Sequence, residues 1–102
     1  MLRIIEQQEG HSLTFRLAGK LVRDWTPELE HCWRRAAETH SHGEFYVDLT
    51  EMTFVDEAGK RLLAAMANAG VQLIAADVLM KALVEQIARG QFSDDDGIEV
   101  PP

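Results

Sequence analysis

The segment Phe54-Val55-Asp56-Glu57-Ala58-Gly59 connects an apolar stretch to the expected start of a helix. An aspartate at this position can cap a helix, because its carboxylate accepts hydrogen bonds from backbone N–H groups of the first turn that have no partner within the helix. The small pair that follows would leave some of these N–H groups open to a partner or an anion. By composition alone the segment is an ordinary loop-to-helix junction. It therefore predicts a helix start and marks a candidate binding surface.

The chain after this junction predicts two helices separated by a strand. The first helix runs from its Asp56 cap to about Asn68, and Gly70 ends it. A strand follows at 71–75, and Asp77 caps a second helix that stops at Arg89-Gly90. Helical spacing places two sets of side chains on the inner faces, Leu62, Leu63, Met66 and Ala69 in the first helix and Leu79, Leu83 and Ile87 in the second.

The chain before the junction predicts a hairpin, a helix and a third strand. Apolar residues alternate at 2–4 and 13–17 around the turn-like Glu9-Gly10-His11. Thr26-Pro27-Glu28 has the residues of a helix start, with the Thr26 hydroxyl expected to accept from a backbone N–H. The helix ends in a loop at 39–43, a strand follows at 45–49, and a loop at 50–53 leads to the junction. The inner positions expected for the helix that begins at Thr26 are Leu29, Cys32, Trp33, Ala36 and Ala37.

Length and element order together predict one small α/β domain. The 102 residues are 46% hydrophobic, which suits one core and no second domain. The order ββαβαβα implies a mixed sheet of four to five strands with three helices, joined by right-handed crossovers. We assign residues 1–90 to this domain and residues 91–102 to an acidic C-terminal tail or a weak edge strand.

Charge and composition disfavour several classes of protein. The net charge of −7 opposes binding to nucleic acid and to anionic lipid. A lone cysteine, Cys32, excludes an internal disulfide and suits a reducing cytosol. The longest apolar runs are far shorter than a membrane-spanning helix, and the first residues form no signal peptide. We therefore expect a cytoplasmic protein that does not insert into a membrane.

The residue patterns for nucleophilic catalysis are weak. Ser12, Ser41 and Ser93 lie in no nucleophile-elbow pattern. Cys32 follows His31 within a helix, where consecutive side chains point in different directions, so we interpret it as a small buried hydrophobe. His40-Ser41-His42 offers two imidazoles without the further ligands of a closed metal site, which favours a solvated loop.

A carboxylate cluster is the basis of the rival hypothesis, a small enzyme or metal binder. Asp48, Glu51 and Asp56 are close in sequence and could act together with His40, since paired carboxylates do acid–base work or bind hard cations. However, Asp56 is already explained as a helix cap and Glu57 as a first-turn acid that the helix dipole favours. We therefore expect no enzyme activity, no metal and no cofactor.

Three stretches of the chain resemble the STAS domain, the anti-sigma factor antagonist family. They are Leu17-Ala18-Gly19-Lys20-Leu21, Phe45-Tyr46-Val47-Asp48-Leu49-Thr50 and Phe54-Val55-Asp56-Glu57-Ala58-Gly59. The likeness extends from about the first strand to about Ile87. It implies a small α/β domain of the bacterial signalling type that binds partner proteins and is often switched by serine phosphorylation.

The chain departs from this family at the switch itself. The family commonly has a phosphorylated serine directly after the aspartate, and Glu57 stands there, followed by Ala58. No phosphorylation site is therefore expected at this junction, and Glu57 is either a partial phosphate mimic or only a helix cap. A second departure is Val22, where kinase-regulated members usually carry an acid.

The resemblance predicts a non-catalytic protein–protein interaction module of the anti-sigma factor antagonist type, acting in signal transduction and transcription regulation. The partner would be an anti-sigma factor, a related regulator or, alternatively, the ATPase of an Mla-type ABC lipid-transport complex, and a homodimer stays open. The loop at 20–25 would lie beside the helix start, where Trp25 is either an interface anchor or a staple for the helix entry. The expected partner-binding residues are Asp56, Glu57, Ala58, Gly59, Lys60, Asp24 and Trp25.

Overall fold

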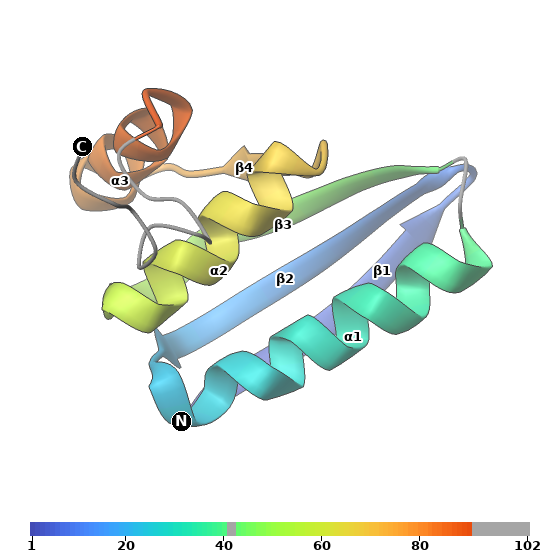
Figure 1. Cartoon of the computed structure of the whole chain (residues 1–102), viewed down its shortest axis with the longest axis horizontal. Helices are drawn as coiled ribbons and strands as arrows, with labels where there is room; N and C mark the ends of the chain where they lie inside the picture. The colour runs from blue at the N-terminus through green and yellow to red at the C-terminus, as the bar shows by residue number, and fades with distance from the viewer. Residues whose placement is uncertain (41–42, 91–102) are drawn as a thin grey trace, which may run out of the picture.

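The computed structural model describes residues 1–40 and 43–90, which form a four-stranded mixed sheet with helices (Figure 1). The sheet order is β1-β2-β3-β4, with β1 antiparallel to β2, and β2, β3 and β4 mutually parallel. The strands are β1 (Leu2–Glu9), β2 (Ser12–Leu21), β3 (Glu44–Val55) and β4 (Gln72–Ile74). The helices are α1 (Thr26–Thr39), α2 (Glu57–Asn68) and α3 (Val78–Ala88), and the single turn η1 (Arg23–Trp25) precedes α1.

This architecture confirms the predicted α/β class, the three helices and the mixed sheet. The described residues contain four strands, and the predicted tail at 91–102 lies outside them. None of the described helices is long and apolar enough to cross a membrane. Asp56 and Asp77 cap α2 and α3 as predicted, because each carboxylate accepts a backbone N–H of its helix at 2.8 Å.

The predicted loop at 50–53 is wrong, because β3 continues unbroken through it. Two register shifts in the pairing with β2 lie between Arg16 and Ala18 and between Gly19 and Lys20. These irregularities change the side-chain alternation, so that the buried residues Leu49, Met52 and Val55 are three apart instead of two. A pattern search at period two therefore misses the second half of β3.

The start of α1 also differs from the prediction. Thr26 is already helical, with φ −62° and ψ −35°, because η1 turns the chain before it. Its hydroxyl consequently donates back to the Arg23 carbonyl at 2.9 Å and accepts from no helix N–H. Pro27 does stand in the first turn of the helix, as expected.

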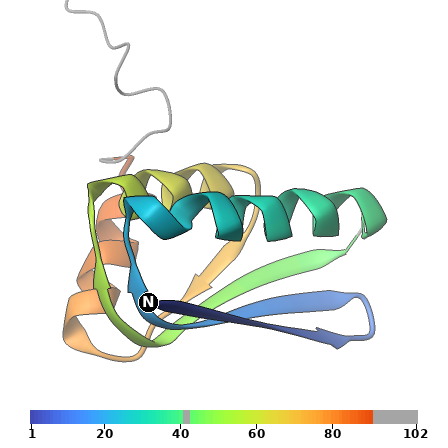
Figure 2. The same cartoon turned by 90° about the horizontal axis from the view of Figure 1, so that it is seen from below.

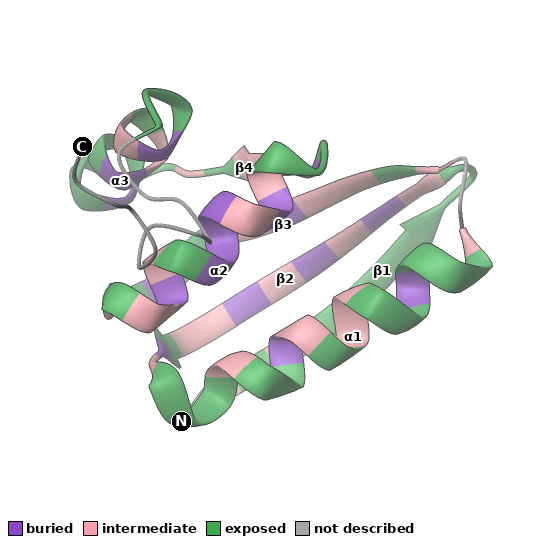
Figure 3. Cartoon of the chain, viewed as in Figure 1, coloured by how far each residue is buried: buried purple, intermediate pink, exposed green. Residues whose placement is uncertain are grey.

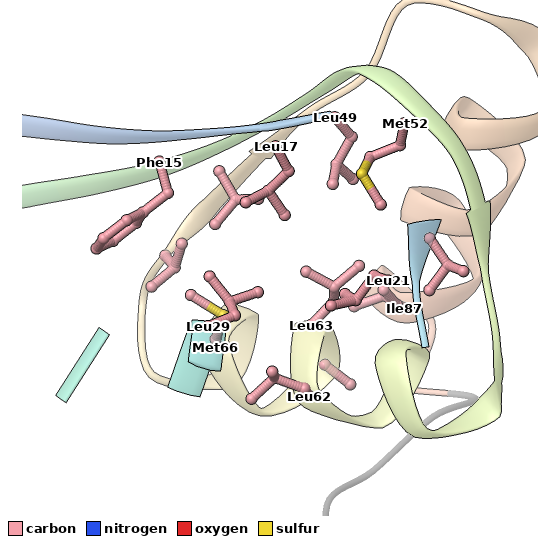
Figure 4. Packing of buried hydrophobic residues seen from close by; sticks show 14 of the residues in the cluster. Phe15, Leu17, Leu21, Leu29, Leu49, Met52, Leu62, Leu63, Met66 and Ile87 are labelled. Carbon is pink, nitrogen blue, oxygen red and sulfur yellow. The ribbon is translucent and has the colours of Figure 1, made fainter. Parts of the chain in front are cut away.

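The core lies between the sheet and the helices, with α1 and α2 on one face of the sheet (Figure 2). Leu17 and Leu49 of the sheet point toward Leu63 and Met66 of α2 (Figure 4), and all four side chains are buried. Burial alternates along β2 (Figure 3), as expected for a strand with one covered face.

Three positions assigned to inner helix faces are exposed instead. Ala37 follows the buried Ala36 by one position, which rotates it about 100° around α1. Ala69 lies just past the end of α2. Leu79 is 75% exposed because Met80, Leu83 and Ile87 form the inner face of α3.

Leu63 should be essential to this core. Replacement by alanine removes a fully buried side chain and leaves a cavity, so we expect Leu63→Ala to lower the free energy of unfolding by about 2 to 5 kcal/mol. Urea denaturation followed by circular dichroism measures this change. Leu79→Ala is the matched control, because the same truncation at an exposed site should change stability by about 0.5 kcal/mol or less. Equal midpoints for the two variants would contradict the assignment.

Candidate binding site

The Asp56 carboxylate connects the start of α2 to the end of β2. Its Oδ1 accepts from the Gly59 N–H at 2.8 Å, and its Oδ2 accepts from the Arg23 N–H at 2.9 Å. The Asp56 N–H in turn donates to the Leu21 carbonyl at 3.1 Å. One residue thus caps α2 and also fixes the position of η1 beside it.

Gly59 allows the first turn of α2 to approach the end of β2 very closely. A Cβ atom at this position would lie 2.7 Å from the Leu21 carbonyl oxygen and 2.8 Å from Val55 Cγ1. The backbone oxygen cannot move aside easily, because Leu21 belongs to β2. Only glycine therefore fits at this contact.

The turn η1 presents two of the predicted site residues. Val22 O accepts from the Trp25 N–H at 2.8 Å and from the Thr26 N–H at 3.1 Å, which closes the turn. Asp24 and Trp25 are exposed, and the Trp25 side chain keeps 37% of its surface accessible. Since η1 contacts α2, the structure brings these residues to the same surface as the helix start.

Glu57 occupies the first turn of α2 and faces solvent. Its carboxylate lies 3.7 Å from the Lys60 ammonium, and its side chain is 64% exposed. The capping bond to the helix is made by Asp56, so Glu57 acts on α2 only through its charge. Ala58 and Lys60 are half-buried, whereas Gly59 is buried, so Glu57 is the most accessible of these residues.

The carboxylates of the rival hypothesis have other partners and are dispersed. Asp48 accepts from the Thr50 N–H at 2.9 Å, and Glu51 lies 3.7 Å from Arg16. His40 follows α1 at the end of the sheet where β3 begins, while Asp56 follows the other end of β3. Within residues 1–40 and 43–90, no three His, Cys, Asp or Glu side chains gather where they could hold a metal ion.

Cys32 is half-buried on α1 and lines a hollow with Glu6, Arg35 and His40. Burial, followed by the negative charge of Glu6, raises the pKa of the Cys32 thiol. A raised pKa lowers the thiolate fraction at neutral pH, which opposes use of this cysteine as a nucleophile. The neighbouring His31 is exposed, and His42 lies outside the described residues.

Sequence reasoning missed an apolar surface close to the site. Phe54 at the end of β3 and Val78 and Leu79 at the start of α3 are exposed by 49%, 81% and 75%. The composition of α3 could have predicted part of this apolar surface. The helix contains only three polar residues, Lys81, Glu85 and Gln86, and its remaining apolar residues are too many to lie on one buried face.

Comparison with solved structures identifies the architecture. The chain is similar to the unphosphorylated anti-sigma factor antagonist SpoIIAA, with a TM-score of 0.65 and 15% identity over 82% of this chain and 83% of that one. It is also similar to an anti-sigma factor antagonist from Mycobacterium paratuberculosis, with a TM-score of 0.71 and 15% identity over 90% and 83% of the two chains. The fold is STAS-like.

A further similar structure extends this finding. A protein of the DUF3478 family from Shewanella loihica, described as having a SpoIIAA-like fold, gives a TM-score of 0.59 at 16% identity over 89% of this chain and 79% of that one. No family model matches the sequence, and no curated protein matches it either. The resemblance seen in three sequence stretches is therefore confirmed at the level of the STAS-like fold.

The stability contributions of the two hydrogen bonds that Asp56 accepts can be separated by comparing the caps of α2 and α3 in this STAS-like domain. Asp56→Ala and Asp77→Ala each remove one capping bond, which costs about 0.5 to 2 kcal/mol. Asp56→Ala also removes the acceptor of the Arg23 N–H, so we expect it to cost about 0.5 to 1.5 kcal/mol more. Urea denaturation measures the difference, and hydrogen exchange should be faster at the Arg23 amide only in Asp56→Ala. Unchanged exchange at Arg23 would contradict the bridge.

The close contact at Gly59 gives a second stability prediction. Gly59→Ala introduces a Cβ against the Leu21 carbonyl, and the displacement should lower the free energy of unfolding by about 1 to 3 kcal/mol, although alanine has the higher helix propensity. Thermal unfolding detects this change. Lys60→Ala, one position along the half-buried surface of α2, provides a control without a new contact. A Gly59→Ala variant more stable than the parent would show that α2 can move away from β2.

Proposed function

We propose that this chain is a non-catalytic STAS-like module that binds a regulatory protein partner through the start of α2 and the adjoining η1. The expected contacts are the residues from Asp56 to Lys60 together with Asp24 and Trp25. The likeness to anti-sigma factor antagonists supports this function.

The observation that carries the proposal is the pair of hydrogen bonds that the Asp56 carboxylate accepts, one from the Gly59 N–H and one from the Arg23 N–H. A carboxylate that holds both η1 and α2 presents Trp25 and Glu57 from two fixed backbones. Binding then loses little conformational freedom, which favours affinity for a partner. Trp25 is a suitable anchor because tryptophan is enriched among the residues that dominate protein–protein interfaces.

The partner we propose is an anti-sigma factor or a related regulator, in the cytoplasm of a bacterium. A second candidate is the ATPase of an Mla-type ABC lipid-transport complex. Glu57 favours this second candidate in one respect, because a constitutive subunit needs no phosphorylated hydroxyl, and Glu57 and Ala58 provide none. The net charge of −7 argues against nucleic acid as the partner in either case.

The test is affinity capture from an extract of the source organism, followed by binding measurements with the purified partner. We expect Trp25→Ala to weaken that binding tenfold or more, in the range of about 1.4 kcal/mol or above. Ile5→Ala is the control, since Ile5 is a similarly exposed apolar residue, 41% accessible, on strand β1. Equal affinities for Trp25→Ala and the parent would place the interface elsewhere.

Glu57 gives a separate prediction about the phosphate-mimic hypothesis. Its charge is exposed and shared with Lys60, so Glu57→Ser should change partner affinity by about threefold or less. Glu85→Ser is the matched control, because Glu85 is 71% exposed and pairs with Arg89 in the same manner on α3. Isothermal titration calorimetry measures both. Binding at least tenfold tighter for Glu57→Ser alone would identify Glu57 as a fixed phosphate mimic.

A further inference from the structure

One row of side chains crosses all four strands on the face of the sheet opposite to α1 and α2. The row consists of Ile5 in β1, Arg16 in β2, Asp48 in β3 and Ile74 in β4, each paired with the next. Successive side chains of a strand point to opposite faces, and Phe15 and Leu17, which flank Arg16, are buried in the core. The row therefore lies on the face away from α1 and α2 (Figure 2).

The four side chains of this row are accessible and differ in kind. Ile5 and Ile74, at its two ends, are 41% and 40% exposed. The Arg16 side chain is 41% exposed, and Asp48 is half-buried. Across the sheet the row therefore has the order apolar, cation, anion, apolar.

This order is complementary to itself under a two-fold rotation. An axis parallel to the strands, passing between β2 and β3, places β1 over β4 of a second copy and β2 over β3. Arg16 of each copy then faces the partner's Asp48, and Ile5 of each copy faces the partner's Ile74. In a symmetric dimer both copies use the same surface, so self-complementarity is the property that such an interface requires.

We propose that this sheet face binds a second copy of the chain, giving a two-fold symmetric dimer in which the strands of the two sheets run parallel. The charges select this orientation. A two-fold axis perpendicular to the strands would place each strand over its own copy, and Arg16 would then face the partner's Arg16. Juxtaposed like charges are strongly unfavourable at an interface, whereas opposite charges fix its register.

The neighbouring row of the same face is compatible with this arrangement. It consists of Gln7 in β1, Thr14 in β2, Tyr46 in β3 and Gln72 in β4. The same rotation brings Gln7 to the partner's Gln72 and Thr14 to the partner's Tyr46. Amide and hydroxyl groups can both donate and accept hydrogen bonds, so this row contains no pair that opposes association.

The net charge of −7 opposes association of two copies. At physiological ionic strength, however, charges separated by more than about 8 Å are largely screened, so the charges of the face itself matter most. In its middle, the cations Arg3 and Arg16 balance the carboxylates Asp48 and Glu51, of which Glu51 lies 3.7 Å from Arg16. Glu9 and Glu44 lie at one end of the face, where they oppose association. We therefore expect a weak dimer.

The test is sedimentation equilibrium of the full chain and of two charge-reversed variants, after circular dichroism has shown that each variant is folded. In a dimer of Arg16→Asp, two carboxylates face each other at both contacts, and in a dimer of Asp48→Arg two cations do so. We expect each variant alone to dimerise at least tenfold more weakly than the parent. Tighter dimerisation of Asp48→Arg would overturn the proposal, because the net negative charge would then govern association.

An equimolar mixture of Arg16→Asp and Asp48→Arg gives the decisive result. In a heterodimer of the two variants, residue 16 of each chain again faces a residue 48 of opposite charge, so we expect the mixture to recover dimerisation. A mixture that stays monomeric while the parent dimerises would overturn the proposal. So would a parent chain that stays monomeric up to about 1 mM, the dissociation constant of a very weak complex.

Arg34→Asp is the matched control. Arg34 is a cation on α1 with 69% of its side chain exposed, and its reversal changes the net charge as much as Arg16→Asp does. We expect Arg34→Asp to leave dimerisation unchanged. Equal weakening by Arg34→Asp and Arg16→Asp would overturn the proposal, since the position of the charge would then be irrelevant.

This inference goes beyond the proposed function and is tested separately from it. The sheet face lies opposite to α2, so a dimer leaves the start of α2 accessible. We expect Arg16→Asp to weaken self-association and to leave the affinity for the regulatory partner unchanged. Self-association is measured without that partner, so failure of the dimer leaves the interface at α2 and η1 to be judged by Trp25→Ala alone.

Discussion

The Asp56 carboxylate satisfies two backbone donors that are far apart in the sequence, and the arrangement of the candidate surface depends on it. The Gly59 N–H belongs to the same helix, whereas the Arg23 N–H lies 33 residues earlier. Because β2 and β3 are parallel, their C-terminal ends lie at the same end of the sheet, and the connections to α1 and α2 begin there. A single side chain can therefore fix the position of both connections, and Gly59 allows the close approach of α2 to β2 that this geometry needs.

Local signals in the sequence were sufficient for the starts of α2 and α3 and for the fold class, but not for the full length of β3. Asp56 and Asp77 could be recognised as caps because a cap acts on residues two or three positions away. The strand at 50–55 depends instead on pairing with β2, whose register shifts break the alternation that predicts strands. The same limitation applies to Thr26, whose role depends on the preceding turn η1.

The sequence predicted which residues form the candidate site, but only part of how they are arranged in space. The resemblance at the junction pointed to the residues from Asp56 to Lys60, and the structure places them beside η1. The bond from Arg23 has no local signature, since any residue supplies a backbone N–H. The exposed side chain of Leu79 was missed for a different reason, because helical spacing alone assigned it to the inner face of α3.

The position of Glu57 bears on how such a surface could be regulated. A phosphate brings about two negative charges and three acceptor oxygens, whereas a carboxylate brings one charge and two oxygens. Here that one charge is 64% exposed to solvent and lies 3.7 Å from Lys60, so the field it presents to a partner is weakened by screening and by pairing. Because this charge is permanent, it cannot switch the surface between two states as the addition and removal of a phosphate would. If the proposed interface is correct, this surface is therefore better suited to constitutive binding than to a switch centred on residue 57.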